Sequence, residues 1–119
     1  MRVPMALCSL LFCACLTPIV SAQDAVKADP KHYTVVSEND QVRIVKVHYG
    51  PHEKSVMHSH PNSVAVFLTD AQAEFTLPDG KKQTMNLKAG ESMYTPAATH
   101  LPENTGGKAM DLILVELKK

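Results

Sequence analysis

From His32 onward, the chain is a succession of short runs of strand-forming residues separated by turn signals. The runs include "HYTVVS", "QVRIVKVHY", "SVAVFLT" and "AEFTL", and the turns include "END", "PDG" and "KAG". No run has a convincing helical period, and we interpret the closing "LILV" as strand because it is short and partly β-branched. Turn signals that recur about every 8–12 residues are typical of a sandwich or barrel. The sequence therefore predicts one all-β domain over residues 32–118, a small β-barrel of about nine strands, closed or nearly closed to limit exposed edges.

The first 22 residues have the pattern of a secretory signal peptide. Arg2 precedes an uncharged, mostly apolar stretch over residues 3–20, and the small-residue sequence "VSA" ends at Ala22. A positive residue, an apolar segment and a small-residue cleavage site in this order direct export. We predict cleavage after Ala22 and a periplasmic or extracellular protein with no membrane attachment. The alternative is a lipoprotein lipidated at Cys15, although the usual leucine three residues upstream is missing.

Cysteine and charge content narrow the chemistry of the mature chain. All three cysteines lie within residues 1–22, so the 97 residues from Gln23 have no thiol to form a disulfide, act as nucleophile or bind a metal. Any metal must therefore be held by histidine, carboxylate or amide groups. The mature chain has 11 Lys and Arg against 12 Asp and Glu, a balance that does not indicate a nucleic-acid partner. Residues 23–31, "QDAVKADPK", are polar and without period, and we interpret them as a linker.

Two histidines one residue apart, His58 and His60, directly precede a run of β-formers. On a strand, side chains at i and i+2 point to the same face, so both imidazoles can bind one ion. A third ligand must come from elsewhere, and His100, after the expected turn "PAAT", is the best placed; His52, in the loop before the pair, is the alternative. Three histidines with open positions describe a catalytic type of metal site. A bare H-x-H is also found where two histidines merely face solvent.

The neighbours of these histidines form two short patterns. Seven residues separate Gly50 from the "HSH" sequence, and five residues separate Gly90 from Pro96. His100 follows closely, and Asn104 comes after three intervening residues. These two patterns resemble the paired motifs of the cupin family, small β-barrels that often hold a metal in the barrel mouth. The resemblance covers nearly the whole mature chain.

The sequence departs from the family motifs at three places. The glutamate of the first motif is replaced by Val64, or by Ala65 if four intervening residues are counted instead of three. Its second glycine is replaced by Ala71, and Ala98 replaces the glycine of the second motif. We expect the side chain of Val64 to point into the barrel mouth near the histidine pair, where a valine cannot coordinate a metal.

The resemblance implies that His58, His60 and His100 are metal ligands for a divalent ion such as Fe, Mn, Zn or Ni. Some cupins that resemble ferrous thiol dioxygenases work with three histidines and no carboxylate. The first hypothesis is therefore an exported oxidoreductase or isomerase. Because three neutral imidazoles leave the ion's charge uncompensated, we expect it to act on a small polar or anionic molecule. The alternative is a non-catalytic module that binds a small ligand with weak or no metal. Cupins also often form homodimers through edge strands, and "HYTVVS" is the candidate.

Several other residues have possible roles at the site. Asn62 keeps the parity of the histidine pair and could offer an amide oxygen, although a turn role is typical of Asn after Pro. Glu53 and Glu103 are candidates for a general base. Only one of Met93 and Tyr94 can face the interior of a strand, and the sequence leaves open which one does.

Overall fold

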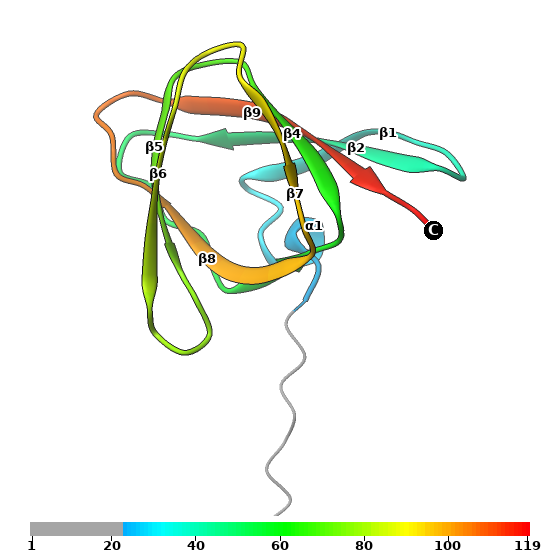
Figure 1. Ribbon diagram of the computed structural model, residues 1–119, viewed down its shortest axis with the longest axis horizontal. Coiled ribbons are helices and arrows are strands. Elements are labelled where there is room, and N and C mark those ends of the chain that lie inside the picture. The colour runs from blue at the N-terminus through cyan, green and yellow to red at the C-terminus, as the bar shows by residue number, and fades with distance from the viewer. Residues whose placement is uncertain (1–22) are drawn as a thin grey trace, which may run out of the picture.

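The computed structural model describes residues 23–119, which form two antiparallel sheets that face each other (Figure 1). One sheet has five strands in the order β1-β2-β9-β4-β7, and the other has four in the order β3-β8-β5-β6. Among these residues, no helix is long and apolar enough to cross a membrane. The strands are β1 (Tyr33–Glu38), β2 (Val42–Tyr49), β3 (His58–His60), β4 (Ser63–Phe67), β5 (Ala71–Thr76), β6 (Lys82–Leu87), β7 (Ser92–Thr95), β8 (Ala98–Asn104) and β9 (Met110–Leu117).

The predicted all-β architecture of the jelly-roll type and the predicted strand number are confirmed. The two sheets do not close into a continuous barrel. β6 and β7 follow each other in the chain, but they are edge strands of different sheets and do not pair with each other. β6 and β7 are short and largely exposed, which limits the edge that they offer to another strand.

Alternation along β2, β9 and β4 builds the apolar core between the sheets. Buried and partly exposed residues alternate along β9 and β4, as expected for strands with one face inside. The register aligns Val45, Leu114 and Ala65 in one inward row across the three strands. The next inward row contains Val47, Leu112 and Phe67, among the other members of the core. Large apolar side chains from distant parts of the chain thus fill the middle of the molecule.

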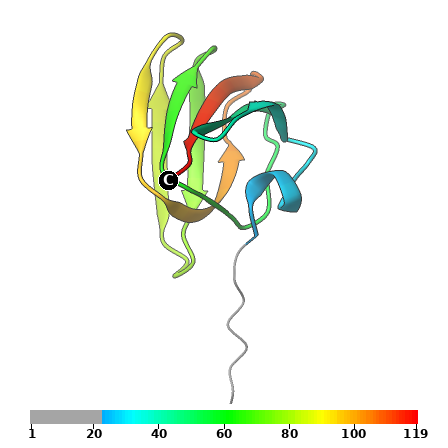
Figure 2. The same ribbon diagram turned by 90° about the vertical axis from the view of Figure 1, so that its right-hand side faces the viewer.

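The prediction of a linker over residues 23–31 is wrong. This segment contains a four-residue helix, α1 (Ala25–Ala28), and packs against β1 and β3 (Figure 2). Ala25 is fully buried, and Asp29 and His32 are buried as well. The polar composition predicts a linker, but the polar groups of the segment have specific partners far away in the chain, such as Arg43 for Asp24 and Ser55 for Asp29.

Candidate metal centre

The pairing of β3 with β8 brings the three predicted histidines together. His58 pairs with His100 across the two strands, and His60 pairs with Ala98. Residues opposite each other on paired strands point to the same face, as do residues two apart on one strand. All three imidazoles therefore project from one face of this sheet, and their ligand atoms lie within 4.8 Å of one another.

His100 was expected to follow a turn, but it lies inside β8. Strand β8 begins at Ala98, directly after Pro96 and Ala97, so the "PAAT" segment is only partly a turn. The outward side chains of the same strand pair, Ser59 and Thr99, join their hydroxyl groups at 2.7 Å. A side-chain hydrogen bond thus links the two strands on their outer face, while their inner face carries the histidines.

The ring nitrogens of the three histidines are arranged as metal binding requires. The Nδ1–H of His58 donates to the carbonyl oxygen of Val56 at 2.8 Å, which leaves the lone pair of Nε2 free. The Nε2 atoms of His58 and His60 lie 2.9 Å apart, close enough for both to bind one ion. The Nε2 atom of His100 is buried and has no hydrogen-bond partner in the described part of the chain. An unpartnered buried nitrogen is costly unless something binds it, so these residues fit a divalent ion with three imidazole ligands.

The environment keeps two of these imidazoles neutral. Burial, together with the neighbouring His60, lowers the pKa of His58 to about 4. Burial, together with His60 and His58, lowers the pKa of His100 to about 3. A neutral imidazole is the form that coordinates a metal, so both side chains are ready to bind at neutral pH.

The same pKa shifts predict how the metal-free protein responds to acid. In the unfolded chain, a histidine has a pKa near 6.5, so the unfolded chain gains protons below this pH that buried His58 and His100 cannot take up. The state that binds more protons is favoured as pH falls. In the presence of a chelator, the free energy of unfolding should therefore fall from pH 6.5 to about 4.5, which urea denaturation at several pH values measures. His100→Gln should show a shallower slope, and an unchanged slope would mean that His100 is not the group responsible.

A buried carboxylate that the sequence did not predict lies behind His60. Glu116, on β9, places its Oε1 atom 3.7 Å from Nδ1 of His60, and its side chain is 3% exposed. The register places it directly beside Arg43 on β2 and Ser63 on β4. The Nε–H of Arg43 donates to Oε2 of Glu116 at 2.6 Å, and the same guanidinium contacts Asp24. A carboxylate behind a ligand imidazole orients its ring and raises its basicity.

Burial and ion pairing act in opposite directions on this carboxylate. Burial alone would raise the pKa of Glu116, but interactions with His60 and Arg43 hold that pKa below its usual value. Hydrogen bonds to Glu116 and Asp24 hold the pKa of Arg43 above its usual value, although burial acts to lower it. Glu116 is therefore a carboxylate at neutral pH, one side chain away from the candidate metal position.

A second polar chain lies behind His58. The hydroxyl of Ser55 donates to Oδ2 of Asp29 at 2.5 Å, and its oxygen lies 3.3 Å from Nδ1 of His58. The same Oδ2 atom of Asp29 lies 2.6 Å from Nδ1 of His32, and the ring of His32 stacks on Tyr49 with centroids 4.2 Å apart. Each histidine of the "HSH" sequence therefore has a carboxylate behind it. Glu116 lies behind His60, and Asp29 lies behind His58 through Ser55.

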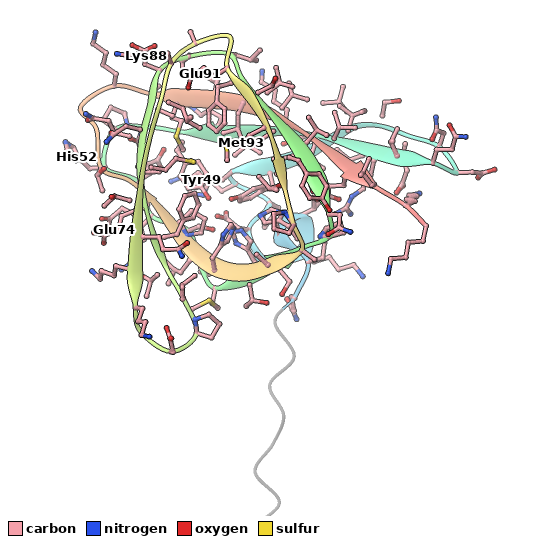
Figure 3. All side chains as sticks on the ribbon, in the orientation of Figure 1. Tyr49, His52, Glu74, Lys88, Glu91 and Met93 are labelled. Carbon is pink, nitrogen blue, oxygen red and sulfur yellow. The ribbon has the colours of Figure 1, made fainter. Side chains whose placement is uncertain are left out.

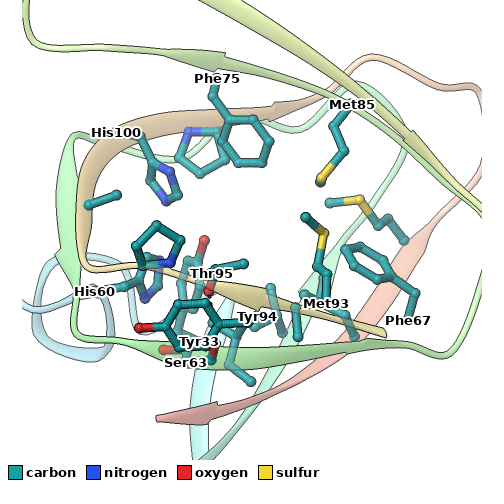
Figure 4. Close-up of a pocket in the computed structure, with 18 of the residues that line it drawn as sticks. Tyr33, His60, Ser63, Phe67, Phe75, Met85, Met93, Tyr94, Thr95 and His100 are labelled. Carbon is teal, nitrogen blue, oxygen red and sulfur yellow. Dashed lines mark hydrogen bonds between the residues drawn. The ribbon is translucent and has the colours of Figure 1, made fainter. Parts of the chain in front are cut away.

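A cavity of about 310 Å³ opens beside the histidines (Figure 4). His60 and His100 form part of its wall, and Phe75 stacks on His100 with ring centroids 4.8 Å apart. Most of the remaining wall is apolar and includes sulfur atoms, and no Asp, Glu, Lys or Arg among residues 23–119 lines it. The apolar side chains are those of Val47, Ala65, Phe67, Phe75, Met85, Met93, Met110, Leu112 and Leu114, among others. The volume is at the small end of the range for small-molecule sites, about 300–1,000 Å³.

The prediction that Val64 points toward the histidine pair is wrong. Val64 pairs with Tyr94 and Val115, and it lies on the outer face of its sheet. Its neighbours Ser63 and Ala65 line the cavity instead. The reason is that β3 and β4 belong to different sheets, so the alternation counted from His60 does not continue through the turn between them. The glutamate position with four intervening residues, held by Ala65, is the one that faces inward.

The register distinguishes Met93 from Tyr94. Met93 pairs with the inward-facing Ala65, so its side chain points into the cavity (Figure 4). Tyr94 pairs with Val64 and is 57% exposed, although it also contributes to the cavity wall. Asn62 has the turn role, because its Oδ1 atom accepts a hydrogen bond from the backbone of Ala97 at 2.8 Å.

The remaining candidates lie outside the cavity wall. His52 is exposed at the edge of the molecule, at a backbone φ of 59° (Figure 3). Glu53 is paired with Lys31. Glu103 forms an isolated bridge with Lys54 and does not line the cavity. The predicted signal peptide and its cleavage site after Ala22 concern residues outside those that the structure describes.

Several known proteins share this architecture. The family model described as "Cupin domain" matches residues 45–116. A cupin-domain structure from Bordetella pertussis is 22% identical with a TM-score of 0.68, and the match covers 83% of this chain and 98% of that one. A protein from Klebsiella pneumoniae with a double-stranded β-helix domain is 24% identical with a TM-score of 0.57, over 71% and 74% of the two chains.

The solved structures that match also include an enzyme. The polyketide cyclase RemF from Streptomyces resistomycificus is 17% identical with a TM-score of 0.55, over 73% of this chain and 64% of that one. No curated protein sequence matches the chain. At these identities, the structural likeness shows the fold alone. The family match covers more than half of the sequence and includes both motifs with their histidines, and on this evidence the chain belongs to the cupin family.

Proposed function

We propose that the protein is an exported cupin that holds one divalent metal ion on His58, His60 and His100 and uses it on a small molecule bound in the adjacent cavity. The observation that carries the proposal is the convergence of three largely buried imidazoles, one with an unpartnered Nε2, at the wall of that cavity. The ion would act as a Lewis acid or redox centre, and the open positions would receive the substrate. An oxidoreductase or an isomerase is the reaction class that this arrangement favours. One structural relative is a polyketide cyclase, so this fold can carry an enzyme.

Export is part of the proposal and rests on the leader sequence. Cleavage after Ala22 would preserve the contacts of the segment that follows, including the backbone hydrogen bond that the carbonyl oxygen of Gln23 accepts from Ser59 on β3. Protein recovered outside the cytoplasm should then begin at Gln23, and a lipid-modified Cys15 in its intact mass would contradict this cleavage site.

The alternative is a binding module that captures a ligand without converting it. It is favoured by the cavity wall, because no carboxylate or lysine among its residues is available as a general base. If a proton must be moved during the reaction, a ligand histidine or a metal-bound water would have to do it. The binding module needs no such group.

The character of the wall narrows the expected ligand. A small polar or anionic molecule was expected from the sequence, and the metal still favours an anionic donor group such as a carboxylate or enolate. The rest of the molecule would contact Phe67, Phe75 and the methionines. These surfaces cannot pair with the hydroxyl groups of a sugar, and the polar wall residues, such as Ser63, Gln83 and Thr95, could pair with only some of them. Leaving the others unpaired is costly. We therefore propose a ligand with one metal-binding anionic group and an apolar or aromatic body.

A binding and turnover assay with the metal-loaded protein tests the proposed function. Elemental analysis should find about one ion per chain, and phenylacetate should bind more tightly than a hexose or a hexose phosphate in calorimetric titrations. His100→Ala should lose the preference for phenylacetate, because the anchor for its carboxylate is gone. Conversion of any apolar carboxylate or enol, followed by mass spectrometry, would support the enzyme, whereas stoichiometric retention without conversion would support the binding module. Equal binding of all three probes would contradict the proposed ligand class.

A further inference from the structure

The segment that precedes the matched family region lies directly against the strand that carries two ligand histidines. The backbone N–H of Ser59, between His58 and His60, donates to the carbonyl oxygen of Gln23 at 2.9 Å. Asp24 forms a parallel bridge with Ser59, and Ala25 is fully buried beside it. Tyr33, at the end of the segment, places its ring edge-on to His58 with centroids 4.9 Å apart. Residues 23–33 therefore form part of the back wall of the metal centre.

Two carboxylates of this segment each reach one ligand histidine through other side chains, Asp29 through one and Asp24 through two. Asp29 accepts the hydroxyl hydrogen of Ser55, whose oxygen lies 3.3 Å from Nδ1 of His58. Asp24 contacts the guanidinium of Arg43, which donates to Glu116 behind His60. The two paths are separate, because the first ends at His58 and the second at His60.

These groups carry the negative charge that the three imidazole ligands do not supply to the ion. The three ligands are neutral, no acidic residue lines the cavity, and Val64 faces away from it. Asp24, Asp29 and Glu116 together carry three negative charges, and Arg43 removes one of them. The balance of these four side chains is negative, opposite in sign to the charge of a divalent ion.

We propose that Asp24 and Asp29 are positioning residues of the metal centre, so that docking of residues 23–33 and binding of the ion strengthen each other. The segment orients His58 and His60 and supplies the counter-charge that the family's glutamate does not supply here. By thermodynamic reciprocity, an ion that binds more tightly to the docked state must hold the segment in place by the same factor. This inference rests on the proposed metal site.

Asparagine variants of the full chain test the inference through metal affinity. Removal of a direct outer partner of a ligand histidine typically lowers affinity about 10–100-fold. Because Asp24 and Asp29 act through other side chains, Asp24→Asn and Asp29→Asn should each lower the affinity for Zn²⁺ by about 10-fold, the lower end of that range. Because the two act through different histidines, their losses should multiply in the double variant. The matched control is Asp111→Asn, since Asp111 also pairs with a histidine, the exposed His48, but has no path to a ligand. This control should keep the affinity of the wild type.

Two further measurements separate positioning from a general loss of structure. In protein saturated with Co²⁺, Asp29→Asn should shift the visible absorption bands, because the ligand field of His58 changes, whereas Asp111→Asn should leave them unchanged. Zn²⁺ should slow hydrogen exchange in residues 24–33 of the wild type but not at the hairpin around Gly80. Asp29 also holds the backbone N–H of His32, so Asp29→Asn could fail to fold. In that case Ser55→Ala, which removes the relay alone, should show the same loss of affinity and the same band shift.

The outcomes are distinguishable. If the wild type binds no ion, the proposed function fails and this inference falls with it. A second outcome is that the wild type binds an ion while Asp24→Asn matches the control in affinity, spectrum and exchange, and Asp29→Asn (or its substitute Ser55→Ala) does so as well. That outcome overturns the inference and leaves the metal site standing. The inference is supported if these variants lose affinity while the control does not. It also requires a shifted spectrum and metal-dependent protection of residues 24–33.

Discussion

Replacing His100 with alanine is expected to lower the affinity for a divalent ion by more than about 100-fold, beyond the typical effect of losing an outer-shell partner. The physical reason is that His100 supplies one of only three ligands, and it is the one whose Nε2 is buried without any other partner. The two remaining imidazoles, His58 and His60, cannot enclose an ion alone. Titration with Zn²⁺ in competition with a chromophoric chelator measures the change, and His60→Ala should show a loss of similar size.

The matched control for this variant is His52→Ala. His52 is exposed at the edge of the molecule, so its replacement should leave the affinity unchanged. Thermal unfolding of both variants without metal shows whether His100→Ala merely destabilises the fold, since it also removes the ring that stacks on Phe75. If His52→Ala loses the ion and His100→Ala keeps it, the third ligand is assigned wrongly.

Replacing Arg43 with methionine is expected to destabilise the protein by about 3–5 kcal/mol, the usual cost of leaving a buried ion pair with one partner. Glu116 is 3% exposed and would keep its charge without a cation beside it, while Asp24 could turn to solvent because it is 27% exposed. Urea denaturation at neutral pH measures the loss. The control is Lys118→Met, which breaks the exposed pair with Glu38 and should cost at most about 1 kcal/mol.

A double variant separates the stability of this pair from its effect on the metal. Arg43→Met combined with Glu116→Leu removes both buried charges, and an apolar pair of similar volume is often as stable as the ion pair that it replaces. Stability should therefore return, while metal affinity should stay low because His60 has lost its carboxylate. A cost of less than about 1 kcal/mol for Arg43→Met alone would show that the pair behaves as a surface salt bridge.

Periodicity and motif spacing were sufficient to predict the fold class and the histidine cluster. The alternation of strand-forming residues predicted an all-β chain because strands with one buried face have a period of two. His58 and His60 were grouped by that same period, and the family resemblance added His100. The structure brings these three together through the pairing of β3 with β8.

The supporting residues could not be predicted because they depend on pairings between distant segments. Arg43 and Glu116 are 73 residues apart in sequence and meet only through the register of β2 with β9. Taken alone, Glu116 in "LVEL" resembles an ordinary outward-facing glutamate of a terminal strand. Asp24 and Asp29 lie in a short polar segment whose only local signal was that of a linker.

The error at Val64 has a local cause. A count of three intervening residues after His60 assigns the family's glutamate position to Val64, which has the same parity as the histidine pair. Instead, the turn moves the chain from one sheet to the other, and β4 begins at Ser63 with an inward-facing side chain. A sequence pattern with period two is informative within one strand, but a turn between sheets resets its phase.

The measurement that tests the metal centre most directly is X-ray absorption spectroscopy of the full chain loaded with one equivalent of Zn²⁺. Binding at the three histidines predicts three imidazole nitrogens at about 2.0–2.1 Å, with light-atom ligands such as water filling the remaining positions. In His100→Ala, the imidazole contribution should fall to two or the ion should not be retained. A wild-type spectrum without imidazole scattering, or a chain that retains no ion at equimolar metal, would contradict the assignment of His58, His60 and His100.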